Sequence, residues 1–143
     1  MRIGGAVVLA CSLVLSACGG SATGPSETPL NLAGTWTGTW TFVSGGSTVS
    51  ETVTMTVTQT GTSAGGQWSS STGTVAGTVA FTPAADFTGT ASISQTLIIG
   101  GNCSATTTLT GTASANQIRF TLGTLTPVNL CQWATNHQFT FNR

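Results

Sequence analysis

Apolar and polar residues alternate with a period of two from residue 34 to the end of the chain. Within 35–43, Trp36, Trp40 and Phe42 fall on one face of an extended chain, and threonines fall on the other. The same alternation recurs near residue 68 and in the segments 49–59, 74–82, 88–98, 104–113, 118–122 and 136–142. The pattern predicts about eight antiparallel strands, each with one buried and one wet face.

Glycines lie on the apolar face in the middle of four of these segments, at Gly38, Gly77, Gly89 and Gly111. A glycine at such a position lets a strand bend sharply. Most segments are joined by short turns rich in Gly, Ser and Asn, which is typical of a meander. We therefore expect an all-β fold, an antiparallel up-and-down β-barrel of about eight strands, with a β-sandwich as the alternative.

The first residues have the features of a bacterial export signal. Met1 and Arg2 precede an apolar stretch, 3–15, which is too short to cross a bilayer as a helix in the mature protein. Residues 15–18, Leu-Ser-Ala-Cys, resemble the lipobox of bacterial lipoproteins. The resemblance implies cleavage before Cys18 and acyl chains on that cysteine. The alternative is an ordinary secretory signal that ends at a cysteine.

These features divide the chain into a lipoprotein signal peptide (1–17), a lipidated flexible tether (18–33) and a β-barrel domain (34–143). The tether is rich in Gly, Ser and Pro, which disfavour regular structure. Gly19 follows the cysteine where, in the familiar sorting rule, an aspartate would mark retention in the inner membrane. We therefore expect a protein of the cell envelope, attached to the outer membrane by its N-terminal lipid.

Charged residues make up only 4% of the chain, and lysine is absent. The predicted mature protein carries two arginines, Arg119 and Arg143, and three acidic residues, Glu27, Glu51 and Asp86. No basic patch can form, so nucleic acid is excluded as a partner. The acidic residues form no recognisable acid–base pair, and no Gly-x-Ser-x-Gly elbow is present. We expect a protein that is not an enzyme and needs no cofactor.

Cysteine usage fits an oxidising compartment. One cysteine leaves with the signal and Cys18 is the predicted lipidation site, which leaves Cys103 and Cys131 as a pair. We expect a disulfide between them, worth about 3–4 kcal/mol in the chain-entropy model, with two free buried thiols as the alternative. In a meander both cysteines lie at the end opposite the N-terminus, where the bond would hold the long connection 123–135. A metal site is not expected, because His137 is the only histidine.

Gly34-Thr35-Trp36 resembles the opening of the first strand in the calycins, the group that includes lipocalins and avidins. The resemblance implies a barrel with Trp36 as the plug of its closed end and an arginine across the indole. Arg143 is the best match to that arginine and Arg119 is the second. The chain departs from the group because it has no tyrosine, no counterpart of the polar biotin-binding set and no C-terminal helix. It also resembles small threonine-rich bacterial lipoproteins.

Three tryptophans, Trp40, Trp68 and Trp133, are candidates to line a pocket for an apolar or aromatic ligand. The alternative for Trp40 and Trp68 is simple core filling. Trp133 lies in the connection that the disulfide would hold, so it is either a lid or a cover for the disulfide.

Several polar residues fall in phase with the apolar faces. Glu51, Gln95 and Thr107 would point into the barrel, where they must be hydrogen-bonded or face a wet cavity. They are candidates to orient the polar end of a ligand, although a shift of one residue in register would turn them outward. His137 also falls near the cysteine end, and without a nucleophile or acid beside it we expect a structural role.

Two functions follow from these features. The first is a membrane-anchored lipoprotein that binds a small, mostly apolar ligand inside a calycin-like barrel. The alternative is a solid-core envelope or surface protein that binds a protein or glycan partner and has no small-molecule ligand. A barrel filled by its own tryptophan, phenylalanine and valine side chains would favour the alternative.

Overall fold

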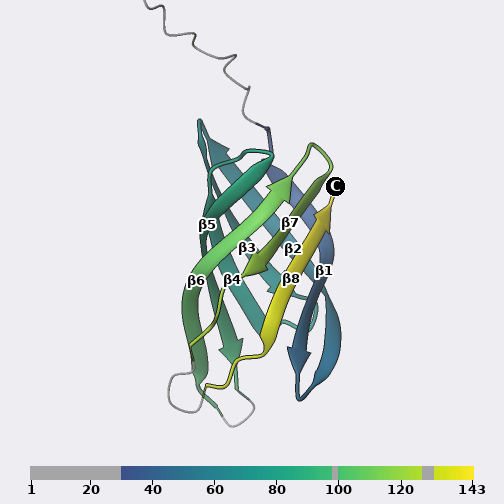
Figure 1. The fold of residues 1–143 in the computed structure, drawn as a ribbon, viewed down its shortest axis with the longest axis vertical. Coiled ribbons are helices and arrows are strands. Elements are labelled where there is room, and N and C mark those ends of the chain that lie inside the picture. Colours follow the sequence, from purple (N-terminus) through teal and green to yellow (C-terminus); the bar gives the residue numbers. More distant parts are fainter. Residues whose placement is uncertain (1–29, 98–99, 127–130) are drawn as a thin grey trace, which may run out of the picture.

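The alternating segments form eight strands that close into one barrel (Figure 1). The computed structural model describes residues 30–97, 100–126 and 131–143. The strands are β1 (Gly34–Ser44), β2 (Ser47–Thr60), β3 (Ser63–Ser70), β4 (Val75–Phe81), β5 (Asp86–Thr96), β6 (Asn102–Ala113), β7 (Gln117–Leu122) and β8 (Thr135–Asn142). Each lies within a few residues of the segment predicted from the alternation. No helix long and apolar enough to cross a membrane occurs among the described residues.

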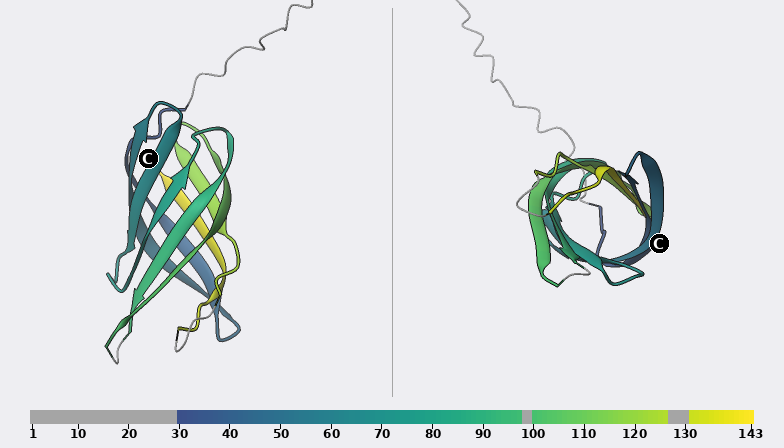
Figure 2. Two further views of the ribbon diagram at one scale, coloured as in Figure 1. Left: turned by 90° about the vertical axis from the view of Figure 1, so that its left-hand side faces the viewer. Right: turned by 90° about the horizontal axis from the view of Figure 1, so that it is seen from below.

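Every strand pairs antiparallel with its neighbour in the sequence, and β8 pairs with β1 to close the ring. This is the up-and-down order that the short turns predicted, so the barrel is confirmed and the sandwich alternative is wrong. Figure 2 shows the closed ring end-on. Closure leaves no open sheet edge, which matters in a chain with so few charges to keep edges apart.

The two faces of each strand are sorted as the alternation predicted. The interior is filled by a single hydrophobic cluster that runs through all eight strands. Trp36, Met55 and Phe141 are among the side chains with no solvent exposure. The outward positions are mostly threonine and serine and are exposed along β2 and β6. Threonine suits this outer face because its branched side chain favours strand geometry while its hydroxyl bonds to water.

Glycines bring neighbouring strands closer together than other residues would allow. At Gly38 a Cβ atom would lie 1.9 Å from the carbonyl oxygen of Thr140. At Gly77 it would lie 2.0 Å from the carbonyl oxygen of Ser92 and 2.6 Å from Nε1 of Trp68. No side chain fits at such distances, so both positions require glycine for close backbone approach. The bends that this allows explain why the sheet closes instead of staying open.

The connections fall at two ends of the barrel. The β1–β2, β3–β4, β5–β6 and β7–β8 connections share one end, and the described N-terminal residues lie at the other beside the C-terminus (Figure 2). We call the first the disulfide end, because Cys103 and Cys131 lie there, and the second the plug end, because Leu32 and Trp36 close it. This placement agrees with the meander expected from the sequence.

Candidate functional site

The plug end is closed by residues that precede the first strand. Leu32 has 0% solvent exposure, and its carbonyl oxygen accepts a hydrogen bond of 2.8 Å from Nε1 of Trp36. The side chain of Gln59 forms two bonds to the same segment. Its Oε1 accepts from the backbone N–H of Leu32 at 2.8 Å, and its Nε2 donates to the carbonyl oxygen of Leu30 at 2.9 Å. Residues 30–33, which the sequence analysis placed in the tether, therefore pack against the barrel.

Arg143 completes this end. Its guanidinium carbon lies 4.5 Å from the Trp36 ring centroid, and Nη2 donates to the carbonyl oxygen of Ala33. Arg119, the second candidate from the calycin resemblance, is exposed on the outer face of β7. The polar groups that Leu32, Trp36 and Gln59 direct toward one another are all paired, so the plug end is a closed structural unit.

An aromatic cluster fills the barrel on the disulfide side of the plug. Trp40 stacks on Phe139 and on His137, with ring centroids 5.8 and 5.7 Å apart. Trp68 meets the same Phe139 edge-on at 4.9 Å and lies 5.7 Å from Trp40. Trp40 and Trp68 are each 3% exposed; Trp40 lies directly opposite Phe139 in the β1–β8 register, and Trp68 reaches both from the inner face of β3, two strands from β1. The structure therefore brings these two predicted residues together inside the core.

His137 is held by two hydrogen bonds. Its Nδ1 accepts from Nε1 of Trp40 at 3.2 Å, and its Nε2 lies 2.9 Å from the carbonyl oxygen of Ala134, to which it donates. This pairing requires the neutral ring with its proton on Nε2. Burial disfavours the charged ring and lowers the pKa of His137 below 6.5, while the bond to Ala134 acts in the opposite direction. The geometry is that of a satisfied core histidine.

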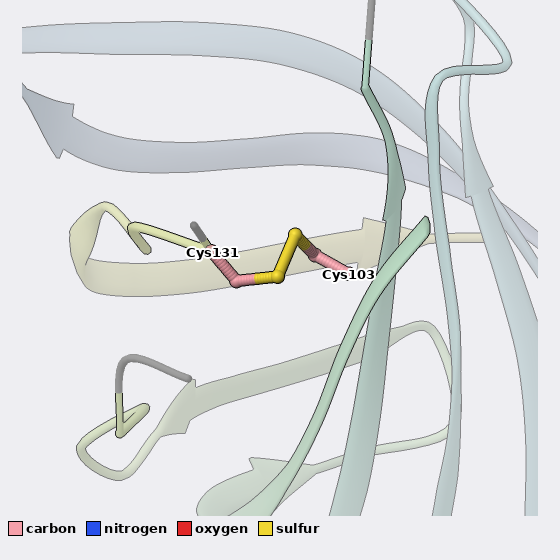
Figure 3. Close-up of a disulfide and its surroundings, with 2 residues drawn as sticks. All are labelled: Cys103 and Cys131. Atoms are coloured by element: carbon pink, nitrogen blue, oxygen red, sulfur yellow. A yellow bond between two sulfur atoms is a disulfide. The ribbon is translucent and has the colours of Figure 1, made fainter. Parts of the chain in front are cut away.

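A disulfide joins Cys103 near the start of β6 to Cys131 in the segment before β8 (Figure 3). Their Cα atoms are 5.6 Å apart, and 28 residues separate them in the sequence. The predicted bond is confirmed. Trp133 lies two residues beyond Cys131 and packs, half-buried, against the edge of the hydrophobic cluster. The disulfide thus holds the segment that carries Trp133 at this end.

The three polar residues predicted to face inward are half-buried but remain apart, with Glu51 and Gln95 toward the disulfide end and Thr107 midway along β6. Glu51 lies opposite Trp40 in the β1–β2 register, and its Oε2 accepts a bond of 3.4 Å from the hydroxyl of Thr72. Gln95 lies opposite Cys103. Thr107 donates to the carbonyl oxygen of Thr124 at 3.1 Å. No hydrogen bond among the described residues joins any two of these three side chains.

Two indole N–H groups are buried without an acceptor among the described residues, those of Trp68 and Trp133. A buried donor without a partner costs about 1–3 kcal/mol, so each needs an explanation. Nε1 of Trp68 lies against Gly77, where a Cβ would come within 2.6 Å of it. The Trp133 N–H lies at the disulfide end, where Glu51 and Gln95 also face inward.

Neither a family model, nor a curated protein, nor a solved structure matches this chain. The site is therefore defined by the geometry of the chain's own residues. Across the described ranges, no cluster of three His, Cys, Asp or Glu side chains is placed to hold a metal ion. Cys18, the predicted lipidation site, lies outside the described residues.

The outer wall of the barrel carries a groove that the sequence analysis missed. It runs over β2–β5 with a volume of about 950 Å³, and we call it the β2–β5 groove. Its lining residues are Thr54, Thr56, Thr58, Gly65, Gly66, Gln67, Trp68, Ser69, Ala76, Gly77, Thr78, Val79, Ser92 and Ser94. A smaller concavity of about 310 Å³ lies over β6–β8 and includes Arg119. A run of small outward residues on β3 and β4 is the only sequence signal for the larger groove.

Proposed function

We propose that the mature protein is a lipid-anchored protein of the cell envelope whose barrel is a solid scaffold, with recognition carried out by its outer surface. This is the alternative that the sequence left beside ligand binding within the barrel. The scaffold resembles a calycin barrel in its strand order, in its plugged end and in the arginine laid over the plug tryptophan.

The packing of the interior carries this proposal. The ring centroid of Phe139 lies 4.7 Å from that of Phe120, its cross-strand partner on β7, and 4.9 Å from that of Trp68 on β3, three strands away around the ring. Rings from strands that are not neighbours therefore meet in the interior, where a ligand would lie in a hollow barrel. Leu32 and Trp36 seal the plug end with no exposure. A filled interior leaves the outer surface as the place for recognition.

Membrane attachment in this proposal depends on Cys18 alone. Along the described strands the outward residues, as on β2 and β6, are mostly hydroxyl-bearing and form no apolar band to contact lipid. The described chain enters at the plug end, so a lipid on Cys18 would hold the barrel by that end. The disulfide end and the outer wall would then face away from the anchor. The residue after the cysteine is glycine, which favours the outer membrane in the familiar sorting rule.

A small apolar ligand at the disulfide end is the second candidate function. It is favoured by the unpartnered N–H of Trp133 and by the half-buried Glu51 and Gln95. An acceptor atom on such a ligand would satisfy the indole, and the nearby rings would contact its apolar part.

Native mass spectrometry of the whole processed protein, purified from its own envelope, separates these two candidates. The solid-scaffold proposal expects the mass of the lipidated chain alone. A small molecule retained at one copy per chain would overturn it in favour of the second candidate.

The anchor has its own test. Replacement of Cys18 by alanine should move the protein from the membrane fraction to the soluble fraction, because acyl chains are attached only to that cysteine. The N-terminal peptide of the wild type should carry a diacylglyceryl group. An unmodified N-terminal peptide in the membrane fraction would contradict the lipid anchor.

A further inference from the structure

The β2–β5 groove owes its shape to small side chains on two strands. Gly65 and Ser69 of β3 and Ala76 of β4 form its floor, while threonines of β2 form one side and Ser92 and Ser94 of β5 form the other. At Gly77, which also lines the groove, the backbone approaches that of Ser92 so closely that a Cβ would lie 2.0 Å from the carbonyl oxygen. A concave surface on the outside of a barrel, which is otherwise convex, is thus built into the sequence of four consecutive strands.

The lining of this groove contains no charged side chain. The charged side chains of the described residues, Glu51, Asp86, Arg119 and Arg143, all lie outside this lining. An anionic or cationic ligand would therefore find no opposite charge to replace the water it loses. The chemistry of the groove points to a neutral ligand.

The groove also has no exposed aromatic residue. Trp68 is the only aromatic residue of its lining and is 3% exposed. Protein interfaces depend on a few tryptophan, tyrosine or arginine anchors, and none is available here. Trp68 and Val79, the largest apolar side chains of the lining, are both buried, so the groove exposes none of the large apolar or aromatic side chains that line pockets for drug-like molecules. Both a protein partner and an apolar small molecule are disfavoured.

The hydroxyl groups of the lining are arranged in rows. Thr54, Thr56 and Thr58 alternate along β2 and are all exposed, so their hydroxyls repeat about every 6.7 Å along the strand. Gln67 adds an amide on β3. Hydroxyls and amides both donate and accept hydrogen bonds, and each threonine also presents a methyl group. A chain of sugar residues carries the matching combination of hydroxyl groups and C–H faces.

Some of these hydroxyl groups already hold the wall in shape. The hydroxyls of Thr78 and Ser92 lie 2.8 Å apart, and the Ser92 hydroxyl also accepts from the backbone N–H of Thr78 at 3.0 Å. Thr58 donates to the carbonyl oxygen of Gly65 at 3.3 Å. These bonds span β2 to β3 and β4 to β5, so the groove is preorganised before any ligand arrives.

We propose that the β2–β5 groove binds a neutral oligosaccharide. This inference rests on the proposed function, because it places recognition on the outer wall of a filled barrel, and it adds the site and the chemical class of the partner. The volume of about 950 Å³ is at the upper end of small-ligand sites and suits several sugar residues in a row.

The test is a titration of the whole processed protein, in a detergent without sugar groups, with cellotetraose, chitotetraose and maltotetraose. Backbone amide signals are followed by NMR, with tetragalacturonate as the acidic control. At least one neutral tetrasaccharide should shift the amides of Gly65, Gly66 and Gly77 in a saturable way, and the acidic control should not. Failure of all three neutral sugars, or equal binding of the acidic one, would overturn the proposal.

Two alanines on the same strand provide a matched pair of variants. Ala76 and Ala80 both point outward from β4 and are exposed, but only Ala76 lines the groove. Ala76→Ile should weaken the binding at least tenfold, whereas Ala80→Ile should change it less than twofold. Gly65→Gln is a second blocking variant, since a Cβ at Gly65 has only an ordinary contact of 3.6 Å with the carbonyl oxygen of Val79.

If Ala76→Ile and Ala80→Ile bind the tetrasaccharide equally well, the sugar binds elsewhere and the proposal is overturned. Amide shifts confined to the β6–β8 concavity would also overturn it. So would an envelope protein that is crosslinked to this chain at Thr56 and that none of the sugars displaces. These failures leave the filled scaffold intact. Failure of the proposed function is a different result, a small molecule retained in native mass spectrometry.

Discussion

The two ends of the barrel are closed by different physical means. At the plug end, Leu32, Trp36 and Gln59 satisfy one another's polar groups, and Arg143 covers the indole. At the disulfide end, one covalent bond holds Cys131, and the nearby Trp133 N–H has no acceptor among the described residues. One end is thus stabilised by many cooperating noncovalent contacts and the other by a cross-link. The difference suggests that the plug end is a structural base, while the disulfide end is the less stable part of the scaffold.

The largest effect is expected from Trp36→Ala. The change removes a fully buried indole and leaves the carbonyl oxygen of Leu32 without its donor. Tryptophan-to-alanine changes in cores cost about 3–5 kcal/mol, and we expect a loss in this range in denaturant unfolding. Trp133→Ala is the matched variant at the other end and should cost clearly less, because Trp133 is half-buried and its N–H is unpaired. Equal losses would remove the distinction between the two ends.

Loss of the disulfide should come next. The Cys103→Ser/Cys131→Ser double variant opens a loop with a sequence separation of 28 residues, which corresponds to about 3–4 kcal/mol in the chain-entropy model. Part of this loss should be local. Hydrogen exchange should accelerate at the start of β6 and before β8, while the amides around Trp36 keep their protection relative to the new global stability. Uniform acceleration at both ends would show that the ends are not independent.

A smaller effect is expected from Gln59→Ala. The backbone N–H of Leu32 and the carbonyl oxygen of Leu30 would each lose a partner, at a cost of about 1–3 kcal/mol. Gln95 is the matched residue, since its side chain also faces inward but lies toward the disulfide end and makes no hydrogen bond to any described residue. Gln95→Ala should therefore change the unfolding free energy by less than about 0.5 kcal/mol. A larger loss for Gln95→Ala than for Gln59→Ala would reverse the comparison.

The strands, the order of the barrel and the disulfide were predictable because each depends on local alternation or on pairing rules. Period-two patterning set the inward faces, and a meander placed Cys103 and Cys131 at one end. The two hydrogen bonds from the Gln59 side chain to Leu32 and Leu30 were harder to predict, because these partners lie 27 and 29 residues away in the sequence and meet Gln59 only when the barrel closes. Gln59 falls in phase with Val57, and this position in the alternation indicates that its side chain faces inward. An inward polar residue needs partners, whichever end it occupies.

The β2–β5 groove was not predictable for a different reason. Its shape depends on the relative sizes of outward residues on four strands and on the close backbone approach at Gly77. The alternation predicts which side chains face inward and which face outward. It does not predict how far the outward side chains of neighbouring strands project from the wall. The small residues Gly65 and Ala76 form a groove only because the register places them between the larger threonines of β2 and the serines of β5.

The smallest effect on stability is expected when the pH is lowered. It distinguishes the two ends because it depends on His137, which lies toward the disulfide end. His137 is the only histidine, and its pKa is lowered by burial, so below pH 6.5 the unfolded chain binds more protons than the folded one. Stability should therefore be fully present above pH 6.5 and fall as the pH drops through the lowered pKa of the folded state. The bond to Ala134 opposes the shift, which keeps the loss modest.

The structural consequence of this protonation should be confined to the disulfide end. A protonated Nδ1 would present a hydrogen to the N–H of Trp40, which now donates to it, so the Trp40–His137 bond would break. Denaturant unfolding at pH 7.5 and pH 5.5 should show lower stability at the lower pH for the wild type and no difference for His137→Gln. Between these pH values the amides near Trp36 should keep their chemical shifts, because His137 lies at the other end of the barrel. Equal pH dependence in both proteins would place the titrating group elsewhere.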